Sequence, residues 1–227
     1  IKPNYAEAYN NLGNCQNSEN DVEAAINSYK TSLQIKPDNS EAYNNMGIIL
    51  KNKKMLDEAI NCFKKAIKIN PNYAEAYSNM GGCMNDKSDF EGAIKSYKYS
   101  LRINPNYFEA YNSLGAVYHN KGNLNEAINC FKKSININIK YADAYNNMGV
   151  TLFEIGSFKD AEISYRKALN LNPNYAEAYF HLGITLQKLG RYEEARVNYR
   201  EAISLKHNYH DAFNNMGVTL QNLGRFE

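Results

Sequence analysis

The stretch from Tyr111 to Phe131 determines the fold: it reads Tyr111-x2-Leu114-Gly115-x2-Tyr118, followed by Ala127-x3-Phe131. The same pattern returns along the chain in steps of 34 residues, without an insertion or a deletion. Its glycine recurs at Gly13, Gly47, Gly81, Gly115, Gly149, Gly183 and Gly217. Its alanine recurs at Ala25, Ala59, Ala93, Ala127, Ala161 and Ala195, each followed four residues later by Tyr or Phe. A regular period of this length indicates a stack of one repeated structural unit.

Each 34-residue unit is predicted to contain two helices. In the first half, an aromatic, a Leu or Met and a Gly share one helix face, as at Tyr77, Met80 and Gly81. Glycine inside a helix costs about 1 kcal/mol relative to alanine. Its return in every unit therefore indicates that the second helix approaches closely at this point.

Local signals predict where these helices begin and end. An Asn or Asp three residues before an acidic residue, as in Asp38 with Glu41, is typical of a capped helix start. The first helix is expected to end in a left-handed residue, which glycine supplies at Gly122, Gly156, Gly190 and Gly224. In the first three units the same place holds Asn20, Lys54 and Ser88. Of these three, only asparagine suits that conformation well.

On these residues the chain resembles the tetratricopeptide repeat (TPR) family over essentially its whole length. The resemblance implies an all-α fold, a right-handed α-solenoid (superhelix) of 34-residue helix–turn–helix TPR repeats. The expected organisation is a tail of a preceding repeat at 1–5, six repeats, and a truncated seventh repeat at 210–227. The six repeats are expected at 6–39, 40–73, 74–107, 108–141, 142–175 and 176–209. Because repeat stacks normally finish in a polar capping element, we expect the uncovered ends to associate end to end.

A column of asparagines is the candidate binding site. The residue just before Leu-Gly or Met-Gly is asparagine in five of seven units, at Asn11, Asn45, Asn79, Asn147 and Asn215. Ser113 and His181 stand at the other two places, and His181 would make contacts there sensitive to pH near 6.5. A carboxamide both donates and accepts hydrogen bonds, so the column suits the backbone of an extended peptide. The alternative is that these asparagines bond between neighbouring helices.

The resemblance places this column on the concave surface, which the first helices line. It is similar to the asparagine ladder in the TPR superhelix of O-linked N-acetylglucosamine transferase, and the surrounding phrases are similar to protein O-fucosyltransferase relatives. Basic residues for a chaperone-type carboxylate clamp are missing from the first repeats, which have asparagine, alanine and glutamate at the relevant places. A second column, of Lys and Arg on the second helices, is interpreted as a solvated convex face. Its members are Lys30, Lys64, Lys98, Lys132, Arg166 and Arg200.

Composition and motifs exclude several classes of function. The net charge is +2, so neither nucleic acid nor an anionic membrane is an expected partner. No apolar run approaches the roughly 20 residues of a membrane span, and we expect a cytoplasmic or nuclear protein. No nucleophile has a visible His and acid partner, and His207 with His210 lacks a third metal ligand. The four cysteines are interpreted as inherited helix residues, because Cys15 to Cys83 and Cys62 to Cys130 share a 68-residue spacing.

The sequence therefore predicts a non-catalytic segment without cofactor or metal, which binds an extended peptide or flexible protein segment along its concave groove. Two alternatives stay open. In one, the segment recruits substrates for a nucleotide-sugar-dependent protein O-glycosyltransferase whose catalytic domain lies outside it. In the other, it is an architectural array that assembles end to end.

Overall fold

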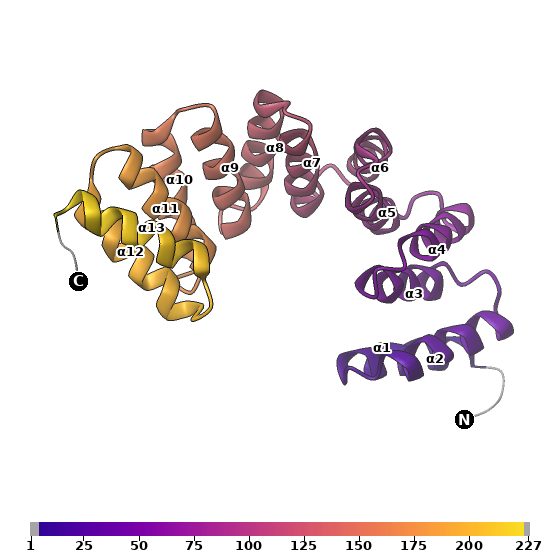
Figure 1. The fold of residues 1–227 in the computed structure, drawn as a ribbon. Helices are drawn as coiled ribbons and strands as arrows, with labels where there is room; N and C mark the ends of the chain where they lie inside the picture. The colour runs from indigo at the N-terminus through magenta and orange to yellow at the C-terminus, as the bar shows by residue number, and fades with distance from the viewer. Residues whose placement is uncertain (1–4, 225–227) are drawn as a thin grey trace. The chain divides into compact units, whose positions relative to one another are not determined.

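The computed structural model describes residues 5–224, which form thirteen α-helices and no strand (Figure 1). The first helices of the hairpins are α1 (Ala6–Ser18), α3 (Ser40–Asn52), α5 (Ala74–Asp86), α7 (Phe108–Asn120), α9 (Ala142–Glu154), α11 (Ala176–Lys188) and α13 (His210–Asn222). The second helices are α2 (Val22–Ile35), α4 (Leu56–Ile69), α6 (Phe90–Ile103), α8 (Leu124–Ile137), α10 (Phe158–Leu171) and α12 (Tyr192–Leu205).

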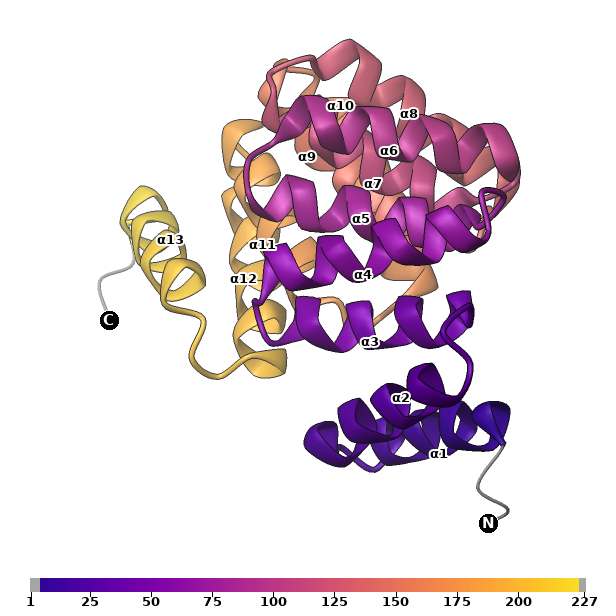
Figure 2. The ribbon, with the colours of Figure 1, turned by 90° about the vertical axis from the view of Figure 1, so that its right-hand side faces the viewer.

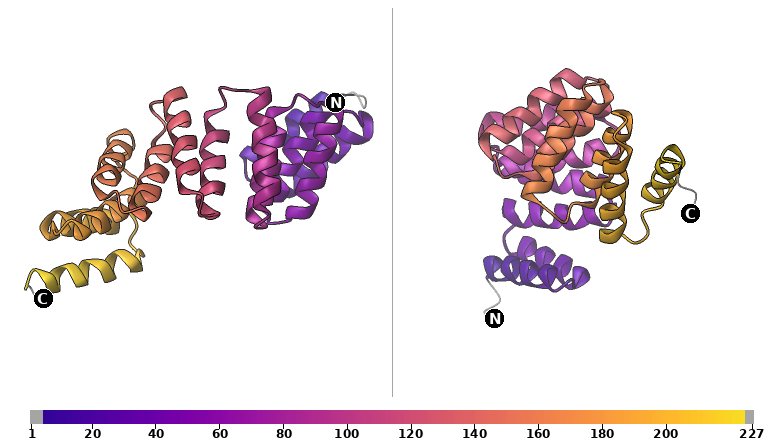
Figure 3. Two further views of the ribbon diagram at one scale, coloured as in Figure 1. Left: turned by 90° about the horizontal axis from the view of Figure 1, so that it is seen from above. Right: turned by 90° about the vertical axis from the view of Figure 1, so that its left-hand side faces the viewer.

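The chain divides into two compact units, residues 1–117 and 118–227, with the boundary inside α7. In the first unit α1 pairs with α2, α3 with α4, and α5 with α6, while α2 also contacts α3 and α4 contacts α5. Figure 2 shows α3 to α6 lying one beside the next. In the second unit, coloured rose to yellow in Figure 3, contacts likewise run from α8 through α13 in chain order. Each unit is a solenoid of helical hairpins, as the sequence predicts.

An aromatic ring packed on a glycine closes five of the hairpins. A Cβ atom added to Gly13 would lie 2.7 Å from Tyr29 Cε1, and one added to Gly47 would lie 2.7 Å from Phe63 Cε1. Gly81, Gly149 and Gly183 meet Tyr97, Tyr165 and Tyr199 in the same way, at 3.1, 2.7 and 2.6 Å. The predicted close approach of the second helix is therefore confirmed at these five repeats.

The core of each unit grows around these rings. In the second unit, the fully buried Tyr165 and Tyr199 form one cluster with Leu182, Leu186 and a row of buried alanines. In the first unit, Tyr29 and Phe63, both at most 1% exposed, are the centres of two smaller clusters. Burying an aromatic side chain of this size contributes about 1.5–3 kcal/mol, and the rings are the largest of the fully buried side chains.

The helix starts differ from the prediction. Asp38 and Asn72 are not N-caps: α3 is capped by Asn39, whose Oδ1 accepts from Ala42 N at 3.2 Å, and Tyr73 precedes α5 without a side-chain cap. At most turns between repeats, the asparagine two residues before the predicted cap accepts a hydrogen bond within the turn. Thus Asn70 Oδ1 accepts from Asn72 N, and Asn104 Oδ1 accepts from Asn106 N, each at 3.1 Å. These side chains stabilise the inter-repeat turn rather than the first turn of the helix.

The first helices end in a left-handed residue, as predicted, both where that residue is glycine and where it is another amino acid. Gly122, Gly156, Gly190 and Gly224 have φ between 68° and 84°. Asn20, Lys54 and Ser88 adopt the same left-handed conformation, with φ of 61° to 63°. The hairpin geometry therefore imposes this conformation at Lys54 and Ser88 although it costs each of them about 1 kcal/mol.

We predict that Gly183→Ala lowers the free energy of unfolding by about 1–3 kcal/mol, because the added methyl group overlaps the buried ring of Tyr199. Gly217 is the matched control: it stands at the same repeat position, and nothing lies within 4 Å of its Cβ direction. Gly217→Ala should be neutral or stabilise by up to about 1 kcal/mol through helix propensity. Urea titration followed by circular dichroism measures both, and equal effects of the two substitutions would contradict the account.

A polar face on the first helices as the candidate binding site

The predicted asparagines lie on the first helices and reach the surface to different degrees. Asn11 is exposed, whereas Asn45, Asn79, Asn147 and Asn215 are half-buried. Asn11, Asn45 and Asn147 each follow a buried asparagine, which is Asn10, Asn44 or Asn146, whereas Asn79 follows the half-buried Ser78 and Asn215 follows the exposed Asn214. In three of the first helices the polar face therefore carries a buried amide beside a more exposed one.

In the first unit, the partly exposed asparagines bridge neighbouring first helices. Asn45 Nδ2 donates to Asn14 Oδ1 at 3.0 Å, and Asn79 Nδ2 donates to Asn44 Oδ1 at 3.1 Å. The hydroxyl of Tyr29 also donates to Asn14 Oδ1, at 2.7 Å. These bonds fix the orientation of the two carboxamides, which remain partly open to solvent. The predicted alternative, bonding between neighbouring helices, is therefore observed for Asn45 and Asn79.

The asparagines of the second unit also bond within their own helices. Asn215 Nδ2 donates to the carbonyl oxygen of Asp211 in its own helix at 2.8 Å, and Asn147 Oδ1 accepts from Asn146 Nδ2 at 3.4 Å. Carbonyl oxygens of both residues accept from the threonines four positions later, Thr151 and Thr219. These threonine hydroxyls are fully buried and hold the helix backbone beneath the polar face.

His181 occupies an aromatic setting rather than an open polar one. Its ring stacks on Tyr165 with centroids 5.8 Å apart, and it also meets the ring of Phe180 at 5.4 Å. Burial lowers the pKa of His181 below 6.5, partly offset by the charge of Glu177. The imidazole is therefore neutral at pH 7, and it interrupts the column of amides with a ring.

A row of carboxylates accompanies the amides, and the sequence interpretation assigned it only to helix capping. Each first helix carries one acidic residue in its first turn, and all are exposed: Glu7, Glu41, Glu75, Glu109, Asp143, Glu177 and Asp211. They stand four residues before the candidate asparagines, which places both on one side of the helix. The regular spacing of these acids in the sequence is the signal that could have found them.

One cation of the second-helix column, Arg166 of α10, takes part in a network of ion pairs that also includes Arg191, the residue before α12. Arg166 Nε contacts Glu162 at 2.9 Å, and its Nη2 contacts Glu194 at 3.3 Å. Arg191 joins the same two carboxylates at 2.7 Å. These contacts raise the pKa of the Arg191 guanidinium and lower that of the Glu194 carboxyl. The network agrees with the interpretation of a solvated surface that carries balanced charge.

The metal-ligating side chains of residues 5–224 are dispersed over the repeats. No group of three His, Cys, Asp or Glu side chains there could hold a metal ion. All four cysteines are free, and burial raises the pKa of Cys83 to about 11, which suppresses its thiolate. No described helix is both long and apolar enough to cross a bilayer.

We predict that His181 makes stability depend on pH. Because its pKa is lowered in the folded state, the unfolded chain binds more protons, so its contribution is complete above about pH 6.5 and is lost as the pH falls from there through the folded pKa. The melting temperature of the wild type should therefore fall more between pH 7 and pH 5 than that of His181→Gln. His119→Gln is the control, since the Nε2 of His119 lies 3.3 Å from Glu154 Oε2 instead of among rings. An identical pH profile in the wild type and His181→Gln would contradict the prediction.

Comparison with known proteins identifies the family to which these repeats belong. Tetratricopeptide repeat models match residues 40–73, 62–95 and 141–208, and a TPR repeat model matches 17–54, 85–122 and 117–156. No curated protein matches the sequence significantly. Three solved structures illustrate the similarity in fold.

A chain of the APC/C hetero-tetramer Cut9–Hcn1 has 18% identity and a TM-score of 0.85 over 96% of this chain, which spans only 43% of that one. YrrB, a TPR protein with an unusual peptide-binding site, has 19% identity and a TM-score of 0.62, covering 82% of this chain and 96% of its own. MamA has 27% identity and a TM-score of 0.64, covering 73% and 96%. With repeat models matching along residues 17–208, the chain belongs to the tetratricopeptide repeat family.

Proposed function

We propose that this protein is an interaction scaffold that binds an extended polypeptide segment along the polar face of its first helices. The backbone contacts would come from Asn11, Asn45, Asn79, Asn147 and Asn215. The proposal rests on how the side chains of Asn45 and Asn79 are held. Each is held by a hydrogen bond to the neighbouring first helix and is still partly open to solvent.

Pre-orientation makes these amides suitable for binding. A side chain that is already fixed loses little conformational entropy when a ligand arrives, so more of each new hydrogen bond appears as affinity. An amide oxygen has two lone pairs and its nitrogen two hydrogens, so Asn79 with one internal bond and Asn45 with two retain capacity for a peptide. A row of such groups contacts main-chain atoms and tolerates varied ligand sequences.

Two further observations support a polypeptide as the ligand. The face carries a carboxylate in every first helix and no matching row of cations, which disfavours anionic ligands such as nucleic acids. Among the proteins of similar fold, YrrB has a peptide-binding site and Cut9 is part of a hetero-tetramer. The peptide-binding site of YrrB and the assembly of Cut9 with other proteins agree with the proposal.

The proposal predicts that Asn79→Ala combined with Asn147→Ala weakens peptide binding by about tenfold to a hundredfold. Each lost amide removes up to two hydrogen bonds of about 0.5–1.5 kcal/mol. The ligand would be a twelve-residue peptide selected from a random library on the wild-type protein, and affinity would be measured by fluorescence anisotropy.

The control variant is Lys64→Ala with Lys132→Ala, which makes two exposed changes on second helices. It should bind like the wild type, and circular dichroism should show unchanged helix content in both variants. Unchanged affinity of the asparagine variant, with the fold intact, would refute the backbone-clamp proposal.

A further inference from the structure

A single cation stands among the first helices of the first unit. Within their bounds, α1, α3 and α5 contain four acidic residues but only one Lys or Arg, which is Lys51 in the last turn of α3. In the other repeats the same position holds Asn17, Asn85, His119, Phe153, Gln187 and Gln221. The repeat pattern therefore does not require a lysine at this place.

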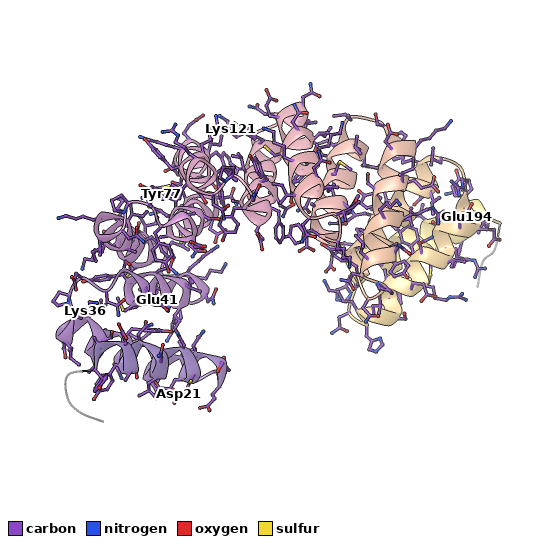
Figure 4. The ribbon with its side chains drawn as sticks, turned by 180° about the vertical axis from the view of Figure 1, so that it is seen from behind. Asp21, Lys36, Glu41, Tyr77, Lys121 and Glu194 are labelled. Atoms are coloured by element: carbon purple, nitrogen blue, oxygen red, sulfur yellow. The ribbon has the colours of Figure 1, made fainter. Side chains whose placement is uncertain are left out.

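Glycine at position 82 provides the space into which Lys51 extends. A Cβ atom added to Gly82 would lie 2.5 Å from Lys51 Nζ and 3.5 Å from the hydroxyl oxygen of Tyr97. Every other repeat has a side chain at this position, namely Asn14, Ile48, Ala116, Val150, Ile184 and Val218. The lysine therefore crosses from α3 to α5, the neighbouring first helices on which Figure 4 labels Glu41 and Tyr77.

The ammonium group of Lys51 lies on the same side of α5 as a candidate asparagine. Asn79 precedes Gly82 by three residues, so the two share one side of the helix. Asn79 Nδ2 donates to Asn44 Oδ1 at 3.1 Å, across the same pair of helices. The cation thus adjoins a carboxamide that is proposed to hold the peptide backbone.

This ammonium group has no acidic partner in residues 5–224. None of the ion pairs there includes Lys51, whereas Lys53, two residues later, pairs with Glu23 at 4.0 Å. Lys51 is half-buried, but its nitrogen is not among the buried polar atoms without a partner, so water reaches it. Asp86, one turn beyond Gly82, is exposed and is not paired with Lys51. An incoming carboxylate can therefore approach Lys51 without breaking an existing ion pair.

We propose that Lys51 binds the carboxylate of an Asp or Glu side chain of the polypeptide ligand and thereby fixes the register of the ligand. Backbone groups are the same at every residue, so a column of amides alone does not distinguish one register from the next. A single ammonium among carboxylates does, because it attracts an acid at one ligand position while the acidic first turns of α1, α3 and α5 repel acids at others. The inference rests on the proposed function, since the ligand backbone must follow the asparagines for its side chain to reach Lys51.

The test uses a twelve-residue peptide selected from a random library on the wild-type protein. The peptide carries an amidated C-terminus, so that only side chains supply carboxylates. Each Asp or Glu is replaced in turn by Asn or Gln, and affinity is measured by fluorescence anisotropy at low salt. One replacement should weaken binding to the wild type by about three- to tenfold and should have no effect on binding to Lys51→Met. Selected peptides without an acid, or the same loss with both proteins, would refute the proposal.

Two further variants locate the effect. Gly82→Ala keeps every charge but places a methyl group where Lys51 Nζ lies, so it should abolish the dependence on the peptide's acid. The variant should stay folded, because the displaced atom is the end of a flexible side chain and alanine favours a helix. Lys53→Met is the matched control, and it should keep the dependence of the wild type. Retention of that dependence in a folded Gly82→Ala variant would overturn the proposal.

The two proposals fail separately. If the library peptide loses affinity on replacement of Asn79 and Asn147 but shows no acid whose effect depends on Lys51, only the register site is wrong. If the coupling to Lys51 is found but replacement of those asparagines leaves affinity unchanged, the backbone-clamp proposal is wrong and Lys51 remains a contact of the ligand.

Discussion

The contact between a second-helix aromatic ring and a first-helix glycine is the constraint on which five of the hairpins depend. The ring of Tyr199 lies where a Cβ of Gly183 would be, so only glycine permits this separation of the two helices. The contact fixes which side of the first helix faces the core. It therefore also fixes which residues face outward, and the candidate asparagines are among these.

Much of the fold could be predicted because it depends on local periodicity. The 34-residue spacing gives the hairpins, and the recurrence of glycine gives the close helix contact. The N-caps of first helices such as α3 and α5 were predicted wrongly because asparagine also stabilises turns. Asn70 and Asn104 bond to the turn, so the residues expected as caps were not needed there. Sequence alone does not say which of two local hydrogen bonds an asparagine makes.

The candidate site was predicted in part. The column of asparagines is visible in the sequence, but its bonds are not, because Asn45 and Asn79 meet partners 31 and 35 residues away. Such choices among competing partners are decided by packing in three dimensions rather than by pattern.

The most direct test of the central claim compares a bound peptide with versions N-methylated at successive backbone positions. N-methylation removes one main-chain donor and leaves every side chain in place. If the asparagines hold the backbone, methylation at alternate contacting positions should each weaken binding by about five- to tenfold, as expected for the loss of one hydrogen bond. Uniform tolerance of N-methylation, with affinity governed by the peptide's side chains alone, would contradict the account.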